Sequence, residues 1–334
     1  MTPLQVTHFQ RKPFGSCFSI ERVFKSVRHA MPRDVAVKAE VCRFVSRGIF
    51  RRLLNVLEAP IHQGNVNHIT GDVNYLALLL RKRKTILTIL DCVLLQSTTG
   101  LNHSRILWFW YLLPVRRVAA VTVISKFTKD WVLRYTGCDP QMVHVIPCPV
   151  SAEFVPSPKE FNADEPILLQ VGTSEHNKNL IRVAEALRGV PCRLDIIGRL
   201  TDRQRRALET NSILYANQWA LSDEEVVERY RKCDMVVFAS TYEGFGMPII
   251  EANATGRPVV TSNIGPMPEV AGSAACLVDP FDCASIREGI LRIINDTDYR
   301  NSLIVRGFEN VKRFQPDVIA AQYANLYREI HLRD

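Results

Sequence analysis

The most informative part of the sequence is residues 235–262, MVVFASTYEGFGMPIIEANATGRPVVTS. It predicts a strand, a glycine-flanked turn, a helix and a second strand in succession. Residues 235–240 form a short apolar run of the kind found in buried strands. Gly244 and Gly246 allow backbone angles that are closed to other residues, and Pro248 suits the first turn of a helix. The backbone amides at the start of this helix are therefore expected to point outward.

Two glutamates, Glu243 and Glu251, flank this turn. A helix start attracts anions and polar oxygens through its unpaired N–H groups and its dipole, which is worth about 0.3–1 kcal/mol at an exposed site. Within the predicted helix, Glu251 can accept hydrogen bonds from the vicinal hydroxyls of a ribose, while Glu243 can bind the hydroxyls of a transferred sugar. The pattern predicts a sugar-nucleotide site, with a simple turn and a solvated helix residue as the alternative.

Apolar, β-rich runs alternate with helical stretches along both halves of the chain. The expected strands are LQVTHF, VAVKAEV, VNHI, KTILTIL, AAVTVIS and VHVIP in the first half, and ILLQVG, CRLDIIG, SILYA, MVVFAS and RPVVTS in the second. Such alternation predicts parallel sheets covered by helices on both faces, with ligands at the carboxyl ends of the strands. We therefore expect an α/β fold of two Rossmann-like, doubly wound domains that face one cleft.

The boundary between the domains is expected at PSPKEFNADEP, residues 156–166, where prolines and acidic residues break both patterns. The expected division is a first domain over residues 1–155, a linker over 156–166, a second domain over 167–315 and a last helix over 316–334. Apolar residues at helical spacing predict helices over 284–294 and 317–331.

Composition is that of an ordinary cytoplasmic enzyme. The chain has 334 residues, 47% of them hydrophobic, and its start does not resemble a secretion leader. Its longest apolar run, residues 106–115, is half the length of about 20 residues that a membrane helix needs. Nine cysteines without a C-x-x-C pair or a histidine at zinc-ligand spacing predict reduced thiols, with no disulfide and no structural zinc.

Charge is divided unevenly between the halves. Residues 1–160 hold 22 Lys and Arg against 10 Asp and Glu, a net +12, and the rest hold 20 against 24, a net −4, which sum to +8. This asymmetry predicts an anionic partner for the first half. Residues 105–117, where aromatic residues lie between arginines, and the basic run 81–84 favour an anionic membrane surface over nucleic acid. A core helix and a solvated basic run remain the alternatives for these two segments.

A second candidate element is VGTSEHNKNL, residues 171–180. A predicted strand ends at Gly172, the loop contains Thr173, and Lys178 opens the next helix. A lysine at a helix start is locally unfavourable for the dipole, so its position indicates a diphosphate ligand, with charged hydrogen bonds worth about 1.5–3 kcal/mol. An ordinary surface lysine is the alternative interpretation.

The stretch 243–260, continued by NIGPMPEVAGSAACLVDPFD, resembles the E-x7-E signature of the retaining glycosyltransferases of family four, or glycosyl transferases group 1. The segment 171–180 resembles the diphosphate loop of that family, with Thr173 in the place of an arginine. The first half is similar to the family more weakly, through the stretch VTVISKFTKDWVLRYTGCDPQMVHVIPCPV that begins at Val121. The resemblance implies the GT-B architecture, an acceptor-binding first domain, a donor-binding second domain and a last helix that crosses back to the first.

The resemblance also implies roles for individual residues. Glu243 and Lys178 are the expected catalytic residues, and Gly15, Ser16 and Asp91 are candidates on the acceptor side, although an aspartate that ends a strand is equally a capping residue. The chain departs from the family pattern at Phe18-Ser19 and at Leu90-Asp91. The donor-binding residues implied are Gly172, Thr173, Lys178, Gly244, Phe245, Gly246, Met247 and Glu251.

The implied function is transfer of a hexose, with mannose favoured, from GDP-mannose or a UDP-hexose to a hydroxyl of a lipid-linked saccharide in cell-surface polysaccharide assembly. The resemblance implies retention of the anomeric configuration, and no metal or other cofactor is expected because no D-x-D motif in a strand context occurs. We expect a peripheral enzyme at the inner face of the membrane, with no nucleic-acid partner. A sugar-nucleotide epimerase or phosphorylase on the same architecture and a non-catalytic glycan-binding protein are the alternatives.

Overall fold

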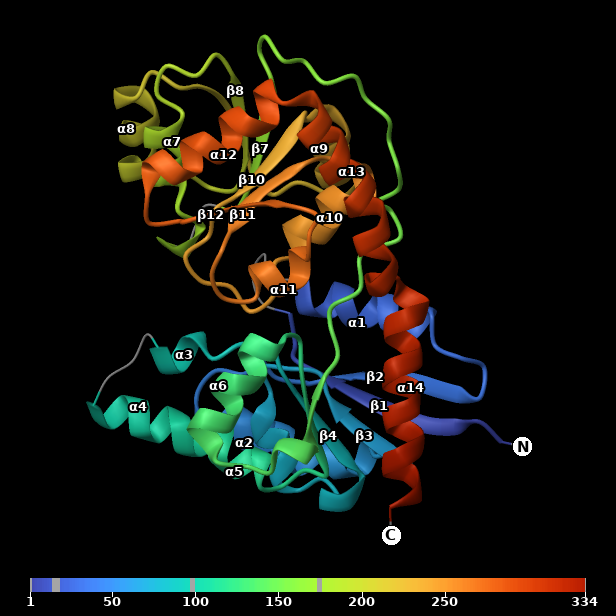
Figure 1. Cartoon of the computed structure of the whole chain (residues 1–334). Coiled ribbons are helices and arrows are strands. Elements are labelled where there is room, and N and C mark those ends of the chain that lie inside the picture. The colour runs from blue at the N-terminus through green and yellow to red at the C-terminus, as the bar shows by residue number, and fades with distance from the viewer. Residues whose placement is uncertain (1, 14–18, 97–99, 173–175, 334) are drawn as a thin grey trace. The chain divides into compact units, whose positions relative to one another are not determined.

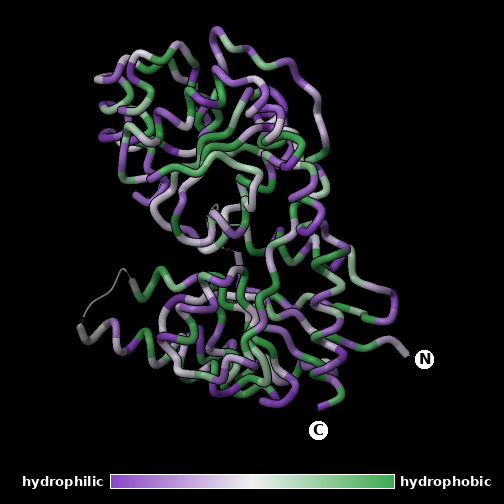
Figure 2. Tube along the Cα trace, viewed as in Figure 1, coloured by the Kyte–Doolittle hydropathy of each residue, from purple (hydrophilic) through white to green (hydrophobic). Residues whose placement is uncertain are grey.

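The computed structural model describes residues 2–13, 19–96, 100–172 and 176–333. The chain divides into two compact units, the first made of residues 1–149 and 316–334 and the second of residues 150–315. Each unit is built on a six-stranded parallel sheet with helices packed on it (Figure 1). Hydrophobic residues follow the strands of each unit, as Figure 2 shows. This agrees with the burial expected for parallel sheets.

The sheet of the first unit has the strand order β2-β1-β3-β4-β5-β6. Its strands are β1 (Leu4–Gln10), β2 (Val35–Val41), β3 (Val66–Ile69), β4 (Thr85–Ile89), β5 (Ala120–Val123) and β6 (Val143–Val145). Its α-helices are α1 (Ser19–His29), α2 (Ile49–Glu58), α3 (Val93–Gln96), α4 (Gly100–Ile106), α5 (Leu113–Val115), α6 (Lys126–Thr136) and α14 (Pro316–Leu332). Shorter helical turns are η1 (Ala59–His62), η2 (Asn74–Leu78), η3 (Lys82–Lys84), η4 (Leu107–Leu112, a π-helix) and η5 (Pro140–Met142).

The last helix, α14, is anchored in the first unit by buried polar contacts. The Tyr327 hydroxyl is hydrogen-bonded to Nε2 of His8 at 2.8 Å and to Nδ1 of His68 at 2.7 Å. Nε2 of His68 reaches Oγ1 of Thr88 at 2.6 Å, so the contact extends across the sheet. Burial lowers the pKa of both histidines, to about 3 for His68, and the two imidazoles are therefore neutral at physiological pH.

The sheet of the second unit has the strand order β12-β11-β10-β7-β8-β9. Its strands are β7 (Ile167–Val171), β8 (Arg193–Ile197), β9 (Leu214–Gln218), β10 (Met235–Phe238), β11 (Val259–Ser262) and β12 (Cys276–Val278). Its α-helices are α7 (Leu180–Ala186), α8 (Asp202–Thr210), α9 (Asp223–Lys232), α10 (Met247–Thr255), α11 (Met267–Ala271), α12 (Cys283–Asn295) and α13 (Thr297–Val311). Two short turns, η6 (His176–Lys178) and η7 (Lys312–Phe314), complete the unit.

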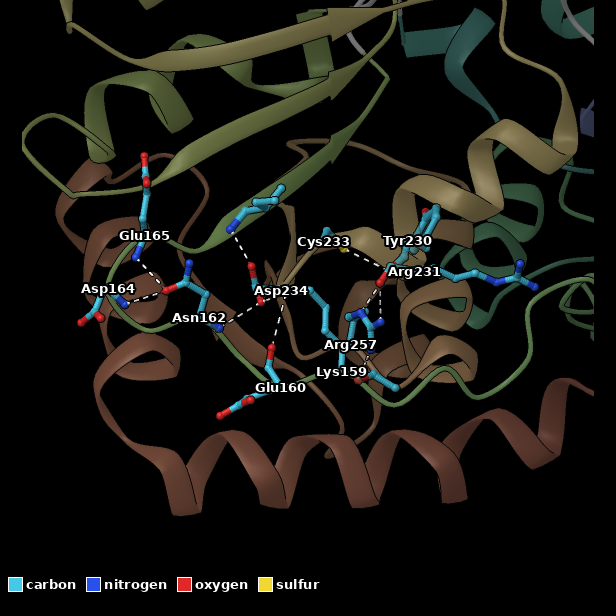
Figure 3. A network of polar contacts seen from close by, with 12 residues as sticks. Lys159, Glu160, Asn162, Asp164, Glu165, Tyr230, Arg231, Cys233, Asp234 and Arg257 are labelled. Carbon is cyan, nitrogen blue, oxygen red and sulfur yellow. Dashed lines mark hydrogen bonds and ion pairs between the residues drawn. The ribbon is translucent and has the colours of Figure 1, made fainter.

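Residues 156–166, the expected linker, are irregular and lie within the second unit. They are held by Asp234, whose buried carboxylate pairs with Lys159 and accepts from the backbone amides of Asn162 at 3.1 Å and Ile167 at 2.8 Å (Figure 3). Because Ile167 begins β7, this network fixes the entry of the chain into the sheet.

The predicted α/β class with two doubly wound sheets is confirmed. Each of the eleven expected runs overlaps a strand, and the expected helices correspond to α12 and α14. The sequence did not predict β12 or α13. The strand β12 spans only three residues, Cys276–Val278, and Leu277 at its centre is exposed, so it lacks the continuous burial of a central strand.

The arginine-flanked segment, residues 105–117, packs largely onto the core of the first unit. Tyr111, Pro114 and Val115 are buried, and Phe109 and Trp110 are partly buried against the core, whereas Trp108 is 54% exposed. Most of this segment therefore follows the alternative of a core helix. In the described ranges, no helix has the length and apolar character needed to cross a membrane.

The basic run at residues 81–84 is partly engaged in the fold. Lys84 donates from Nζ to the carbonyl oxygen of His331 at 2.9 Å, next to the end of α14. Backbone N–H of Arg81 donates to Oε1 of Gln63 at 2.8 Å, and its guanidinium bonds the Gly64 carbonyl. Arg81 and Lys84 thus take part in holding the fold together.

Candidate functional site

In the second unit, the loops that follow β7 and β10 lie next to each other, because these strands are neighbours in the sheet although β8 and β9 separate them in the chain. The order of the strands reverses at this place. Open α/β sheets bind ligands where the strand order reverses, outside the carboxyl ends of the strands. Lys178 follows β7 and Glu243 follows β10, so the two predicted catalytic residues lie at this switch point.

An ion pair joins these two side chains. Nζ of Lys178 donates to Oε1 of Glu243 at 2.7 Å, and the side chains are 20% and 14% exposed. The ammonium also lies 5.4 Å from the centroid of the Phe238 ring, whose π-face attracts cations. A positive and a negative group are thereby held side by side, largely withdrawn from water, at the carboxyl ends of β7 and β10.

Gly172 leaves the space that the Lys178 side chain occupies. Its φ is +86°, and a Cβ at this position would lie 3.1 Å from Cε of Lys178. A larger residue would therefore strain the backbone and displace the lysine. The predicted importance of Gly172 thus has a structural reason that concerns the position of Lys178.

Hydrogen bonds fix the loop after β7 to the loop after β10. The backbone amide of Thr241 donates to the Asn177 carbonyl at 2.8 Å, and Nδ2 of Asn177 donates to the Tyr242 carbonyl at 2.6 Å. Asn179, in the left-handed conformation with φ of +59°, donates from Nδ2 to the Ala239 carbonyl at 2.9 Å. Sequence reasoning missed these asparagines, which hold the Lys178–Glu243 pair in register.

The glycine-flanked turn ends where α10 begins. Gly246 precedes the helix with φ of +118°, and a Cβ there would lie 3.0 Å from Cδ1 of Ile249. Phe245 is buried and packs edge-to-face against Phe314, with 5.7 Å between the ring centroids. Met247, the first residue of α10, is half-buried. The turn is therefore anchored by an aromatic residue between its two glycines.

The other predicted glutamate, Glu251, lies on α10 and receives a hydrogen bond at Oε2 from the Tyr230 hydroxyl. Tyr230 is fully buried, and burial together with the neighbouring carboxylate raises its pKa well above the usual value, so the hydroxyl stays protonated and donates. Arg257 donates from Nε to the Tyr230 carbonyl at 3.0 Å and from Nη2 to the Arg231 carbonyl at 2.6 Å (Figure 3). Glu251 is thus oriented by a tyrosine whose own backbone is fixed.

Tyr230 and Arg257 were not identified from the sequence. Tyr230 precedes Glu251 by 21 positions and lies on α9, so no local motif links the two residues. A usable signal was that Tyr230 is an aromatic residue in the mostly charged helix DEEVVERYRK, and that Arg257 lies just before the apolar run of β11.

The first unit has a corresponding switch point between β1 and β3. Arg11, just after β1, donates from Nε to Oε1 of Glu21 at 2.9 Å and also pairs with Asp72, just after β3. Asp72 has φ of +56°, and burial raises the pKa of its carboxyl while Arg11 opposes that shift. This charged cluster was missed, although Gly71-Asp72 directly after a predicted strand was a usable signal.

The predicted acceptor-side residues are placed only in part. Oδ1 of Asp91 accepts from the backbone N–H of Val93 at 3.0 Å, so Asp91 caps the start of α3 as the alternative interpretation expected. A contact of Asp91 with an acceptor stays a prediction. Gly15 and Ser16, together with Phe18 and the donor-side Thr173, lie outside the described residues.

The arrangement in the second unit suits a ligand that has both negative charge and hydroxyl groups. Lys178 can donate charge-assisted hydrogen bonds to phosphate oxygens, and the carboxylates of Glu243 and Glu251 can accept from hydroxyls. Within residues 2–13, 19–96, 100–172 and 176–333, no three His, Cys, Asp or Glu side chains are grouped as metal ligands.

Two family models match the chain in succession. The model described as Glycosyl transferases group 1 matches residues 152–309, which include Lys178, Glu243 and Glu251. The model described as Glycosyltransferase Family 4 matches residues 50–154. The two matches run continuously from residue 50 to residue 309.

The chain is also similar to curated proteins and to solved structures. The O-antigen chain mannosyltransferase B of Escherichia coli is 27% identical over 233 residues, which are 62% of this chain and 60% of that protein. The chain therefore spans about three-fifths of the length of this curated relative. Sucrose-phosphate synthase of Thermosynechococcus elongatus has a TM-score of 0.78 at 17% identity, covering 98% of this chain and 99% of that one. HepE of Anabaena, solved in complex with UDP and glucose, has a TM-score of 0.78 at 14% identity, and the match covers 98% of this chain and 100% of that one.

Proposed function

We propose that this chain, which belongs to the group 1 glycosyltransferases of the GT-B type, transfers a hexose from a nucleoside diphosphate sugar to a hydroxyl group of an acceptor. The observation that carries the proposal is the Lys178–Glu243 ion pair at the switch point of the second unit. The name of the Escherichia coli relative supports mannose as the transferred sugar, and hence GDP-mannose as the donor. A UDP-hexose is the second candidate, because HepE was solved with UDP.

Lys178 stabilises the leaving diphosphate in this proposal. Negative charge accumulates on the diphosphate as the bond to the sugar breaks, and an ammonium held in place by the fold stabilises that charge without reorganisation. The pair with Glu243 means that Lys178 is already oriented before the donor arrives, and its 2.7 Å contact would be shared with a phosphate oxygen afterwards.

Glu243 orients the transferred sugar through its hydroxyls and stabilises positive charge at the anomeric carbon. We propose substitution on the front face. The bond from the anomeric carbon to the diphosphate breaks, the acceptor oxygen bonds to the same face, and the acceptor proton moves to the departing diphosphate oxygen. The anomeric configuration is then retained, and no separate protein base is required.

Glu251 binds the vicinal hydroxyls of the ribose. Its carboxylate accepts hydrogen bonds at both oxygens, and the Tyr230 hydroxyl binds at Oε2. The hydrogen bond from Tyr230 holds the carboxylate in one orientation, which lowers the entropy lost when the ribose binds.

The reaction is proposed to be independent of metal ions, because Lys178 and the start of α10 supply the positive charge that a divalent ion supplies to a diphosphate elsewhere. Transfer in the presence of a chelator at the rate measured with added Mg²⁺ is the expected result. A rate that depends on Mg²⁺ or Mn²⁺ would contradict this part of the proposal.

The acceptor is proposed to be a lipid-linked saccharide in the assembly of a cell-surface polysaccharide. The O-antigen function in the name of the relative supports this choice, and so does the net charge of +12 on the first 160 residues. An acceptor of this type places the enzyme at the inner face of a membrane with anionic lipids.

Incubation of the protein with GDP-mannose and with UDP-hexoses tests the function, with the released nucleoside diphosphate and the sugar product measured together. We expect release with one donor class, a new glycosidic bond in the same anomeric configuration by NMR, and loss of transfer in Glu243→Gln. Glu228→Gln, an exposed glutamate on α9, is the matched control and should keep full activity. A donor converted to its epimer with no glycosidic product would establish the epimerase alternative instead.

A further inference from the structure

The helix α2 in the first unit exposes five of its hydrophobic side chains, whereas Val56 is buried. Ile49 is 86%, Phe50 78% and Leu57 56% exposed, and Leu53 and Leu54 are also exposed. These positions lie on one face of a helix, because residues three or four apart are neighbours on its surface. Ile61, in the turn η1 that continues α2, extends the same spacing and is 79% exposed.

The opposite face of α2 is turned into the unit, where Val56 packs in the hydrophobic core beside the polar Asn55 and Arg52. Buried Asn55 accepts at Oδ1 from the Phe44 backbone N–H at 3.1 Å and donates from Nδ2 to the Phe44 carbonyl at 2.9 Å. Arg52 lies over the ring of Trp110, 5.0 Å from its centroid, and donates to the Ser46 carbonyl at 3.2 Å. The inward face is therefore fixed by specific hydrogen bonds and stacking, and the helix cannot rotate its apolar face inward without losing them.

Exposed arginines accompany the apolar face. Arg43 and Arg47 lie in the segment that leads into α2, and Arg51 lies in its first turn. The first unit as a whole holds 23 Lys and Arg against 11 Asp and Glu, a net +12. An apolar helical face bordered by arginines is complementary to a lipid surface with negative headgroups, which attracts basic side chains close to it.

We propose that α2, with Ile61, is an interfacial helix that docks the first unit on an anionic membrane surface. Its leucines and Phe50 enter the boundary between headgroups and acyl chains, and Arg43, Arg47 and Arg51 contact lipid phosphates. This assigns the membrane contact to a helix other than the segment at residues 105–117, most of which packs on the core. The proposal extends the proposed function by naming the surface through which a lipid-linked acceptor is reached.

Charge favours lipid over a second copy of the chain as the partner of this face. In a two-fold symmetric dimer the same patch meets itself, so two surfaces that both carry an excess of basic residues would be brought together. Like charges brought together in this way destabilise the contact. An anionic surface neutralises them instead.

Co-sedimentation of the full chain with vesicles tests the proposal in the absence of any sugar nucleotide. We expect binding to vesicles of phosphatidylcholine with about one-third phosphatidylglycerol and much weaker binding to phosphatidylcholine alone, with the difference reduced by high salt. The variant Phe50→Ser/Leu57→Ser should lower the partition coefficient by roughly tenfold or more for each side chain removed. Arg51→Gln should reduce the preference for anionic lipid about fivefold.

The matched control is Leu214→Ser/Leu277→Ser, which makes the same chemical change at two exposed leucines of the second unit and should bind vesicles like the parent. Trp108→Ser tests residues 105–117 and should have little effect on vesicle binding. Binding of GDP and UDP, measured by calorimetry on each variant, should stay unchanged, which separates failure of the docking proposal from failure of the proposed function.

Three results would overturn the proposal. The parent protein would not bind anionic vesicles, or the Phe50→Ser/Leu57→Ser variant would bind as well as the parent. Alternatively, sedimentation would show a dimer that this variant dissociates, which would assign the face to a second copy. Thermal melting at an unchanged temperature verifies that each variant is folded.

Discussion

The first unit carries 23 Lys and Arg against 11 Asp and Glu, a net +12, whereas the second carries 19 against 23, a net −4. Both units are built on a six-stranded parallel sheet with one reversal of strand order. In the second unit the reversal holds the Lys178–Glu243 pair, and in the first it holds Arg11 with Glu21 and Asp72. One sheet architecture thus supports two sites of different charge and chemistry.

The units also differ in what their surfaces and interiors contain. The first has the exposed apolar helix α2 and a buried pair of histidines, His8 and His68. The second contains one histidine, His176, and buries charged groups as pairs, such as Asp234 with Lys159. We therefore propose that donor chemistry belongs to the second unit, and that membrane attachment and the response to acid belong to the first.

The largest effect is expected from Lys178→Ala. Removing one group that stabilises developing negative charge lowers turnover by roughly 10²–10³-fold in well-studied enzymes. The measurement is kcat with a saturating donor. Lys232→Ala, a solvent-exposed lysine of the same unit, is the control and should keep normal turnover. Near-normal rates in Lys178→Ala would contradict the assignment of donor chemistry to the second unit.

Acid is expected to destabilise the first unit more than the second. Burial lowers the pKa of His68 to about 3, below its value in the unfolded chain, so the unfolded state binds the extra proton. The stabilisation is therefore full above about pH 6.5 and is lost as the pH falls, by about 2 kcal/mol at pH 5 for this histidine. Burial also lowers the pKa of His8, so it acts in the same direction.

Hydrogen–deuterium exchange, corrected for the intrinsic rate at each pH, tests this difference within the intact chain. Peptides from α14, which contacts both histidines through Tyr327, should lose protection between pH 7.5 and pH 5, while peptides from α12 should keep theirs. His68→Gln should make the loss smaller. Equal loss of protection in α12 and α14 would show that the buried histidines do not distinguish the units.

Tyr230→Phe is expected to weaken the binding of the donor nucleotide by about tenfold, because the hydrogen bond that orients Glu251 is lost. Calorimetry with the nucleoside diphosphate measures the effect. Tyr323→Phe, a buried tyrosine of the first unit, is the matched control and should bind the nucleotide normally. Equal weakening in both variants would indicate a general loss of stability.

The smallest effect is expected at the surface of the first unit. Arg328 on α14 pairs with Asp34 at 2.8 Å, with side chains 40% and 59% exposed. Exposed ion pairs stabilise by about 0.2–1 kcal/mol, so Arg328→Ala should lower the free energy of unfolding by no more than about 1 kcal/mol in a urea titration. A larger loss would show that this pair, as well as the histidines, anchors the last helix.

Sequence periodicity predicted the strands well because parallel strands buried on both faces are continuous apolar runs. It also brought Lys178 and Glu243 to one ligand, since strand order in doubly wound sheets places such loops together. The direct contact between these residues and the role of Tyr230 depend on side chains far apart in the chain, which periodicity does not encode.

The orientation of α2 was beyond prediction for a different reason. An apolar helical face normally packs inward, and here Asn55 and Arg52 find partners inside.

The assignment of Lys178 is tested most directly by calorimetry of paired ligands. The binding of GDP and guanosine, or of UDP and uridine, would be measured for the parent chain and for Lys178→Ala. We predict that the variant binds the diphosphate about ten- to a hundredfold more weakly, as expected for loss of a charge-assisted hydrogen bond, and binds the nucleoside unchanged. Equal affinity of both proteins for the diphosphate would contradict a donor site at the switch point of the second unit.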